Sequence, residues 1–183
     1  MALSVTFILN FNSHEAALVS LSIGIIGLIF EVLRLKNTSI NKFFLKRAGR
    51  FLRETEKNKI SGFIYYCFGV SACFFLFKWE IAIQSIFFLI LADPIASIIG
   101  VMFGKNNLIF GKSLEGSLAC FLVCFIISAV SGFFYLKVPW LTFAFLGGLS
   151  GAISELLAIL DDNLTIPLFS GFLLTQSYSF LVS

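Results

Sequence analysis

The residues best suited to chemistry lie between Leu91 and Gly116, where acids, lysines and glycines interrupt an otherwise apolar chain. Glycines admit phosphate oxygens to backbone N–H groups, lysines supply positive charge, and carboxylates bind Mg²⁺. This segment therefore has the composition of a phosphate-binding site, although a tight turn with solvated lysines would contain the same residue types. The candidate phosphate-contacting residues are Gly100, Gly104, Lys105, Gly111, Lys112, Ser113 and Gly116.

Asp93 heads a stripe of small side chains on a helix that we expect to end near Gly104. At roughly 100° per residue the stripe falls within about 60° of the helix surface, so a neighbouring helix or a ligand can approach the backbone closely. Pro94 removes one backbone hydrogen bond directly after this acid, and we expect an unwound turn there. The stripe comprises Asp93, Ala96, Ser97, Gly100 and Gly104.

The Gly-Lys-Ser sequence at 111–113 does not form a Walker phosphate-binding loop. That loop follows a strand and begins with a glycine five residues before its Gly-Lys pair. Here Asn106 and Asn107 stand where that glycine belongs, and the apolar residues Leu108, Ile109 and Phe110 come next. Any phosphate site in this chain must therefore have a different architecture.

Two further stripes of small residues also lead to acids. One ends at Glu31, and Arg34 follows at the spacing of an intrahelical ion pair, so these two residues form either a structural pair or part of a site. The other ends at an Asp-Asp-Asn sequence, 161–163, after an apolar segment. The stripes comprise Ser20, Gly24, Gly27 and Glu31, and Gly148, Gly151, Glu155, Ala158 and Asp162.

The composition is typical of a polytopic membrane protein. Of 183 residues, 58% are hydrophobic, 24 are Phe and only 13% are charged, and the mean hydropathy is +0.98. The net charge of +3 is small, and most of the basic residues lie in one loop. Both observations argue against nucleic-acid binding. Four cysteines in apolar segments and a single histidine argue against disulfides, zinc and histidine catalysis.

We expect an all-α fold: a polytopic membrane bundle of about six transmembrane helices plus one amphipathic interfacial helix, as a single domain over residues 1–183. Nine of the 13 Lys and Arg residues lie between Arg34 and Lys59. The positive-inside rule therefore places the loop 36–59 in the cytoplasm and both termini outside. Apolar and basic residues recur in this loop at helical spacing, with Thr38 or Ser39 as N-cap. The expected spans are 16–35, 60–77, 81–103, 117–136, 141–160 and 164–182.

This topology brings the acids toward one membrane face. Asp93 lies about 12 residues into its span, ~18 Å from the outer end of a ~30 Å core. Because the third and fifth helices carry small-residue stripes, we expect them to pack along those stripes and to gather four charged groups into one site. The four are Asp93, Lys112, Glu115 and Asp162. A transporter or a scaffold is an alternative that intramembrane acids alone would also suit.

The motif D-x-x-A-S-x-x-G-x-x-x-G-K from Asp93, followed by G-K-S-x-E-G from Gly111, resembles the signature of the CTP-dependent lipid kinases. That family includes dolichol kinase, phytol kinase and the CTP-using diacylglycerol kinase. Glu155 followed by D-N-L-T-x-P at 162–167 is similar to a later family motif. EVLRL at 31–35 and RETEKNKISGFIYYCFG at 53–69 extend the resemblance over roughly residues 30–175. Pro94 and Ile95 depart from it, since many relatives carry small residues there.

The resemblance implies an enzyme that transfers the γ-phosphoryl group of CTP to a lipid alcohol and uses Mg²⁺. It implies that Asp93, Glu115 and Asp162 are catalytic and metal-binding, and that the lysines and glycines of 100–116 bind the nucleotide. Supporting roles fall to Glu31, Arg34, Ser97, Glu155 and Asn163. The expected partners are the membrane, the nucleotide and a lipid alcohol of the polyprenol, phytol or diacylglycerol type. A homo-oligomer is compatible with the sequence.

A phosphatidate cytidylyltransferase, which makes CDP-diacylglycerol, is the alternative that also uses CTP and Mg²⁺ in a membrane. Its signature contains a Lys-Asp pair, a His-Gly-Gly sequence and a closing Asp-Arg-x-Asp, and none of these occurs here. For either enzyme we expect a multi-pass protein with its active site on the cytoplasmic face. The plasma membrane of a bacterium is the host membrane that we expect.

Overall fold

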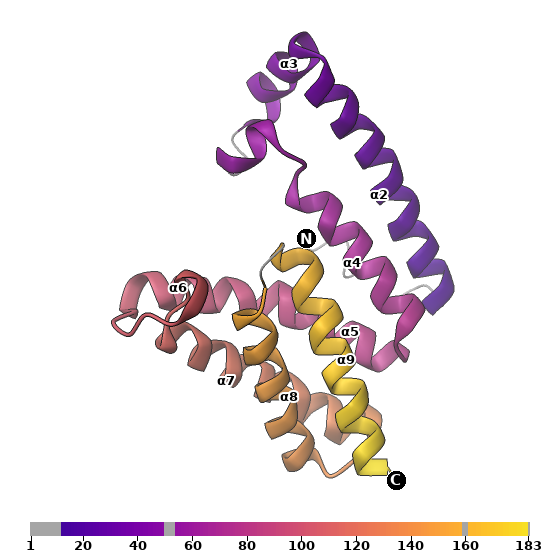
Figure 1. The fold of residues 1–183 in the computed structure, drawn as a ribbon. Helices are drawn as coiled ribbons and strands as arrows, with labels where there is room; N and C mark the ends of the chain where they lie inside the picture. The colour runs from indigo at the N-terminus through magenta and orange to yellow at the C-terminus, as the bar shows by residue number, and fades with distance from the viewer. Residues whose placement is uncertain (1–11, 50–53, 159–160, 183) are drawn as a thin grey trace.

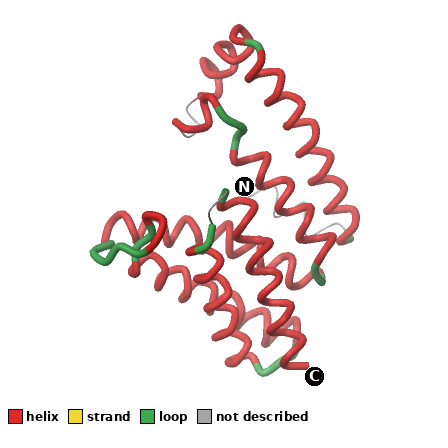
Figure 2. The backbone as a smooth tube through the Cα atoms, in the orientation of Figure 1, coloured by secondary structure: helices red, strands yellow, loops and turns green. Residues whose placement is uncertain are grey.

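The computed structural model describes residues 12–49, 54–158 and 161–182, and the regular elements in these ranges are helices (Figures 1 and 2). The α-helices are α2 (Ser13–Lys36), α3 (Thr38–Ala48), α4 (Gly62–Leu76), α5 (Trp79–Phe87), α6 (Asp93–Phe103), α7 (Leu114–Ser131), α8 (Trp140–Leu156) and α9 (Asp162–Val182). The 3₁₀ segments are η2 (Glu54–Asn58) and η4 (Ile109–Gly111), and the π-helical segments are η3 (Phe88–Ala92) and η5 (Gly132–Leu136). The expected all-α fold is confirmed for these ranges.

Four helical runs in the described ranges are long and apolar enough to cross a membrane. They are Ser13–Lys36, Trp79–Phe103, Leu114–Leu136 and Asp162–Val182. The helices α4 and α8, of 15 and 17 residues, are shorter and apolar, and they occupy the positions of the other two expected spans. The chain is therefore an integral membrane protein, while the crossing of the membrane by α4 and α8 remains a prediction.

Several helices begin or end at other residues than the expected spans do. α7 begins at Leu114 rather than at 117, because the Ser113 hydroxyl accepts a hydrogen bond from the backbone N–H of Gly116 at 3.1 Å. α9 begins at Asp162 rather than at 164, and α8 ends at Leu156. Residues 159–160 of the expected fifth span lie outside the described residues.

A helix in the basic loop is confirmed as α3, but its N-cap is neither Thr38 nor Ser39. The side-chain oxygen of Asn37 accepts hydrogen bonds from the backbone N–H groups of Ser39 and Ile40 and so caps the helix one residue earlier. Residues 50–53 of the same loop lie outside the described residues. The interfacial location of α3 remains a prediction.

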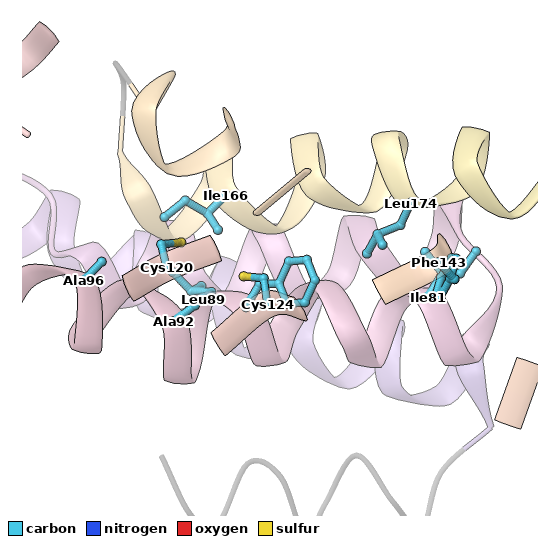
Figure 3. Packing of buried hydrophobic residues seen from close by; sticks show 10 residues of the cluster. Ile81, Leu89, Ala92, Ala96, Cys120, Cys124, Phe143, Ile166 and Leu174 are labelled. Atoms are coloured by element: carbon cyan, nitrogen blue, oxygen red, sulfur yellow. The ribbon is translucent and has the colours of Figure 1, made fainter. Parts of the chain in front are cut away.

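The helices are arranged as a pair and a bundle (Figure 1). α2 packs against α4, and this pair extends away from the other helices, with α3 at its far end. α9 packs against α4, α5 and α8, and α7 packs against both α6 and α8. Buried residues of α5 to α9 form the core of the bundle, among them Ile81, Leu89, Cys124, Phe143 and Leu174 (Figure 3).

The stripes on α6 and α8 face α7, so the expected stripe-on-stripe packing of the third and fifth helices is wrong. A Cβ added at Gly116 of α7 would lie 2.8 Å from the carbonyl oxygen of Ala96 on α6. A Cβ added at Gly148 of α8 would lie 2.7 Å from the ring of Phe121 on α7. The small residues thus let α7 pack closely against a helix on either side.

The helix that carries Asp93 does not unwind at Pro94. The turn before it, Phe88–Ala92, is π-helical, and α6 then continues to Phe103 with Pro94 in its first turn. A π-helical turn changes the hydrogen-bond register, and this accommodates a residue that has no N–H to donate. Turns of this kind are frequent beside functional sites.

Candidate functional site

Lys112 lies at the centre of a charged cluster at one end of the bundle. Its Nζ is 2.9 Å from Oε1 of Glu155 and 3.7 Å from Oδ1 of Asp162. The lysine belongs to the loop before α7, Glu155 to the last turn of α8, and Asp162 to the first turn of α9. Asp93 on α6 lies near enough for its charge to act on Lys112. Residues from four helices or their connecting loops therefore converge here.

The electrostatics of the cluster hold Lys112 in its charged form. Burial by itself lowers the pKa of the Lys112 ammonium, but the hydrogen bond to Glu155 and the charges of Asp162, Glu155 and Asp93 together raise the pKa above its usual value. The Lys112 side chain is 20% exposed and that of Asp162 26%, whereas that of Glu155 is only 4% exposed. The cluster thus has a buried side at Glu155 and an open side at Asp162.

Ser117 completes the buried side. Its hydroxyl donates a hydrogen bond to Oε2 of Glu155 at 3.1 Å, while Oε1 receives the Lys112 ammonium. Both oxygens of Glu155 are therefore occupied, and this carboxylate orients Lys112. Glu155 was predicted only as a supporting residue and no role was predicted for Ser117, although Ser117 follows Ser113 by one helical turn.

The loop between α6 and α7 forms a compact hairpin beside the cluster. Backbone N–H groups of Leu108 and Leu114 donate to the carbonyls of Lys112 and Asn106 at 2.8 and 2.9 Å. At its tip Gly111 has φ of 75°, a conformation that favours glycine, and a Cβ built there would meet nothing within 4 Å. Gly111 is therefore an open backbone position directly before Lys112, as a phosphate contact would require.

The other candidate glycines are packed between α6 and α7. A Cβ at Gly100 would lie 3.0 Å from the Ser113 hydroxyl oxygen, and one at Gly104 would meet the same side chain at 3.0 Å. With Gly116 already against Ala96, these three glycines are used for helix packing. Their contact with a nucleotide remains a prediction that this packing does not favour. Lys105 and Ser97 are both exposed, and their predicted roles also stay open.

Glu115 lies outside the Lys112 cluster. Its carboxylate accepts hydrogen bonds from the side-chain and backbone N–H groups of Asn106, at 3.0 and 3.4 Å, and so ties α7 to the loop. Of the four residues expected to form one site, the structure brings together Asp93, Lys112 and Asp162, with Glu155 in the place expected for Glu115. Among residues 12–49, 54–158 and 161–182, no three acidic, Cys or His side chains are arranged to hold a metal.

The Asp-Asp-Asn sequence forms a local turn that starts α9. Oδ1 of Asp161 accepts hydrogen bonds from the backbone N–H of Asn163 at 3.0 Å and from its side-chain Nδ2 at 2.9 Å. The carbonyl of Asp161 then accepts from the N–H groups of Leu164 and Thr165. This turn fixes the start of the helix whose first residue, Asp162, faces Lys112.

A second charged cluster surrounds Arg34, which is fully buried. Its Nη2 lies 2.6 Å from Oε2 of Glu31, so the ion pair predicted from the spacing is present. Nη1 donates to Oδ1 of Asn41 on α3 at 3.0 Å, and the guanidinium lies over the Phe44 ring at 5.3 Å. The guanidinium also donates to the backbone carbonyls of Glu56, Lys57 and Lys59. These partners favour the structural interpretation of the pair.

A groove of about 480 Å³ between α5 and α7 lies away from both clusters. Its wall includes Phe87, Leu91 and Val130. The residues that line the groove include none of the Lys112 cluster.

Comparisons with known proteins find relatives named CTP-dependent diacylglycerol kinase 1. The Schizosaccharomyces pombe protein is 31% identical over 160 residues, which cover 79% of this chain and 72% of that protein. Those of Eremothecium gossypii and Saccharomyces cerevisiae are each 28% identical, and the matches cover 78% and 80% of this chain but only 52% and 58% of theirs. No family model matches the sequence, and no solved structure does.

The helical architecture and the charged cluster define an integral membrane protein with a polar site where its helices end. The extent of the match to the fission yeast protein is specific enough to assign the family. The chain belongs to the CTP-dependent lipid kinases, as the motifs around Asp93 and Asp162 predicted.

Proposed function

We propose that this protein transfers the γ-phosphoryl group of CTP to a lipid alcohol at the Lys112 cluster. The observation that carries the proposal is the sharing of Lys112 between Glu155 and Asp162 beside the open backbone of Gly111. Phosphoryl transfer needs positioning and positive charge on the phosphate oxygens rather than covalent catalysis. A lysine at the membrane edge, held in its charged form, supplies both.

The unequal distances suggest how the nucleotide engages Lys112. The contact with buried Glu155 is short, whereas Asp162 is 3.7 Å away and partly exposed. A phosphate oxygen that takes the place of Asp162 would keep the lysine anchored through Glu155. The Asp162 carboxylate would then be released next to the phosphate, where it is placed either to bind Mg²⁺ or to receive the proton of the attacking hydroxyl.

Mg²⁺ fits this site in part. Mg²⁺ is usually bound by one or two carboxylates together with substrate phosphates, so Asp93 and Asp162 suffice as protein ligands. The single Lys112 ammonium faces three carboxylates, those of Glu155, Asp162 and Asp93, so the cluster keeps a negative charge that suits a cation. When bound, the metal would neutralise charge on the transferred phosphoryl group. Glu115 would join it only if its contacts with Asn106 were broken.

We further propose diacylglycerol as the acceptor and the cytoplasmic face as the side of the active site. The names of the relatives favour diacylglycerol as the lipid alcohol, over a polyprenol or a phytol-type isoprenoid. The basic loop and the charged cluster favour the cytoplasmic face as the side from which CTP enters, in a bacterial plasma membrane. A cysteine introduced at Asn41 or Asn107 should be labelled by an impermeant reagent only after the membrane is opened.

The decisive experiment uses purified protein in liposomes with labelled CTP, ATP or GTP and a panel of lipid alcohols. We expect phosphorylated diacylglycerol, CDP as the nucleotide product, a preference for CTP and loss of activity with EDTA. Release of pyrophosphate would instead identify a cytidylyltransferase. Absence of turnover with every alcohol would support a transporter or a scaffold.

A further inference from the structure

Arg34 holds a loop in place with more bonds than the end of one helix requires. Its Nη2 donates to the carbonyls of Glu56 and Lys59 at 3.1 and 2.9 Å, and its Nη1 donates to that of Lys57 at 3.2 Å. The Glu31 carboxylate balances the buried charge at 2.6 Å. Because the guanidinium is rigid and planar, several carbonyls on one fork fix the backbone between α3 and α4.

The side chain that this loop positions is the Glu56 carboxylate. Its Oε1 accepts a hydrogen bond from the backbone N–H of Gly62 at 2.6 Å. A Cβ built on Gly62 would lie 2.9 Å from the same oxygen and 2.8 Å from Nδ2 of Asn163. The carboxylate of the loop and the amide of the α9 turn therefore both border the space that a side chain at Gly62 would fill.

Asn163 connects this contact to the candidate active site. Nδ2 of Asn163 also donates to Oδ1 of Asp161 at 2.9 Å, and the intervening residue, Asp162, is the partly exposed partner of Lys112. An amide carries two hydrogens, so Asn163 has one for Asp161 and one directed elsewhere. A carboxylate next to it favours one orientation of the amide and therefore one geometry of the turn.

We propose that Glu56 is a positioning residue of the site, held by Arg34 and acting through Asn163 on the turn that presents Asp162. The effect of Glu56 on turnover rests on the proposed function, but its effect on the α9 turn does not. Glu56 lies in the segment 53–69 that extends the family resemblance, and no role was predicted for it from the sequence. The competing explanation is that Glu56 only caps the start of α4.

Ser61 supplies a matched control for the capping explanation. Its hydroxyl accepts a hydrogen bond from the backbone N–H of Phe63 at 3.3 Å, so it caps the same helix start at a different N–H group. Ser61→Ala and Glu56→Ala each remove one acceptor from the first turn of α4. Only Glu56→Ala should disturb α9.

The first test is amide hydrogen exchange of full-length protein, read at Leu164 and Thr165, whose N–H groups donate to the Asp161 carbonyl. Glu56→Ala should accelerate exchange there by about tenfold, and Ser61→Ala should leave it at the wild-type rate. Glu56→Gln keeps an acceptor for Gly62 and should fold normally where Ala does not, with a smaller acceleration in the same direction. Wild-type exchange in both Glu56 variants would overturn the proposal.

The second test is a double-mutant cycle on turnover with Asn163→Ala. Each single variant should lower kcat by about tenfold with KM for CTP nearly unchanged, and the double variant should be no slower than the slower single one. Effects that multiply would show that the two residues act independently and would sink the idea. If wild-type protein has no kinase activity but the exchange results hold, the proposed function fails and the positioning role of Glu56 stands.

Discussion

The Arg34 and Lys112 clusters are both built from a basic residue and buried acid, yet they differ in how completely the cation is held. Arg34 is fully buried and donates to a carboxylate, an amide oxygen and three backbone carbonyls. Lys112 is partly exposed and has one close carboxylate and one at 3.7 Å. A guanidinium with this many fixed partners is suited to hold structure, including the loop that carries Glu56, whereas an ammonium with a loose second partner can exchange that partner for a ligand.

The largest effect should follow from the loss of Arg34. Arg34→Met leaves the Glu31 carboxylate buried without its cation, and removal of one partner of a buried pair costs about 3 to 5 kcal/mol. We expect a large fall in melting temperature and in the yield of folded protein in detergent. Arg47→Met, at an exposed residue whose guanidinium lies over the Phe43 ring, is the control and should change little. Equal melting temperatures for the two variants would remove the distinction between the clusters.

Lys112→Gln should affect turnover more than folding. Because Lys112 supplies charge to the phosphates, its loss should lower kcat on the order of 10²-fold. The melting temperature should fall less than in Arg34→Met, because the Ser117 hydroxyl and the introduced amide can still donate to the buried Glu155 carboxylate. Lys42→Gln, on the exposed face of α3, should retain wild-type turnover. A Lys112 variant that melts like an Arg34 variant would make both clusters structural.

Asp162→Asn and Asp93→Asn should also lower turnover on the order of 10²-fold, because both carboxylates act at Lys112. Glu115→Gln should lower it by less than about threefold, since its carboxylate is engaged with Asn106 and an amide oxygen can still accept one of those two hydrogen bonds. Initial rates at saturating CTP and Mg²⁺ measure the difference. An equally large loss in Glu115→Gln would restore this residue to the metal site.

The smallest effects are expected from alanine substitutions of glycines, and they distinguish Gly116, which is packed between helices, from the open Gly111. Gly111→Ala should cost about 1 to 2 kcal/mol, because its φ of 75° is left-handed, and should disturb no neighbour. Gly116→Ala must in addition push α7 away from the Ala96 carbonyl and should lower the melting temperature further. The reverse order in thermal unfolding would contradict the assignment of Gly116 to helix packing.

Much of the fold follows from the sequence, because apolar segments and the polar loops between them mark the helices independently of tertiary contacts. The α-helical character, the six apolar segments and the helix in the basic loop were all predictable in this way. Asn37 as the cap of α3 was not predicted, because Asn, Thr and Ser all serve as caps and their sequence order does not decide among them.

The contacts between residues of the site were harder to predict than the residues that belong to it. Helical periodicity shows which residues share a face but not which helix covers that face, and α7 proved to cover both α6 and α8. Glu115 and Glu155 are both acids near the expected site, and only the packing of α7 on α8 directs Glu155 toward Lys112. A role for Glu56 could not be predicted for the same reason, since Asn163, which borders the same space, lies more than a hundred positions away in the chain.

The short lengths of α4 and α8 have a consequence for the surrounding lipid. At 1.5 Å per residue they measure only ~22 and ~25 Å, against a hydrocarbon thickness of ~30 Å. Their neighbours α2 and α9 are long enough to match the bilayer fully. The predicted crossing of the membrane by α4 and α8 would therefore require the bilayer beside them to thin locally, or their ends to lie below its surface. Gly62 starts α4 and Leu156 ends α8 next to the charged clusters, so hydrophobic mismatch would lower the boundary between water and lipid where a soluble nucleotide and a membrane alcohol have to meet.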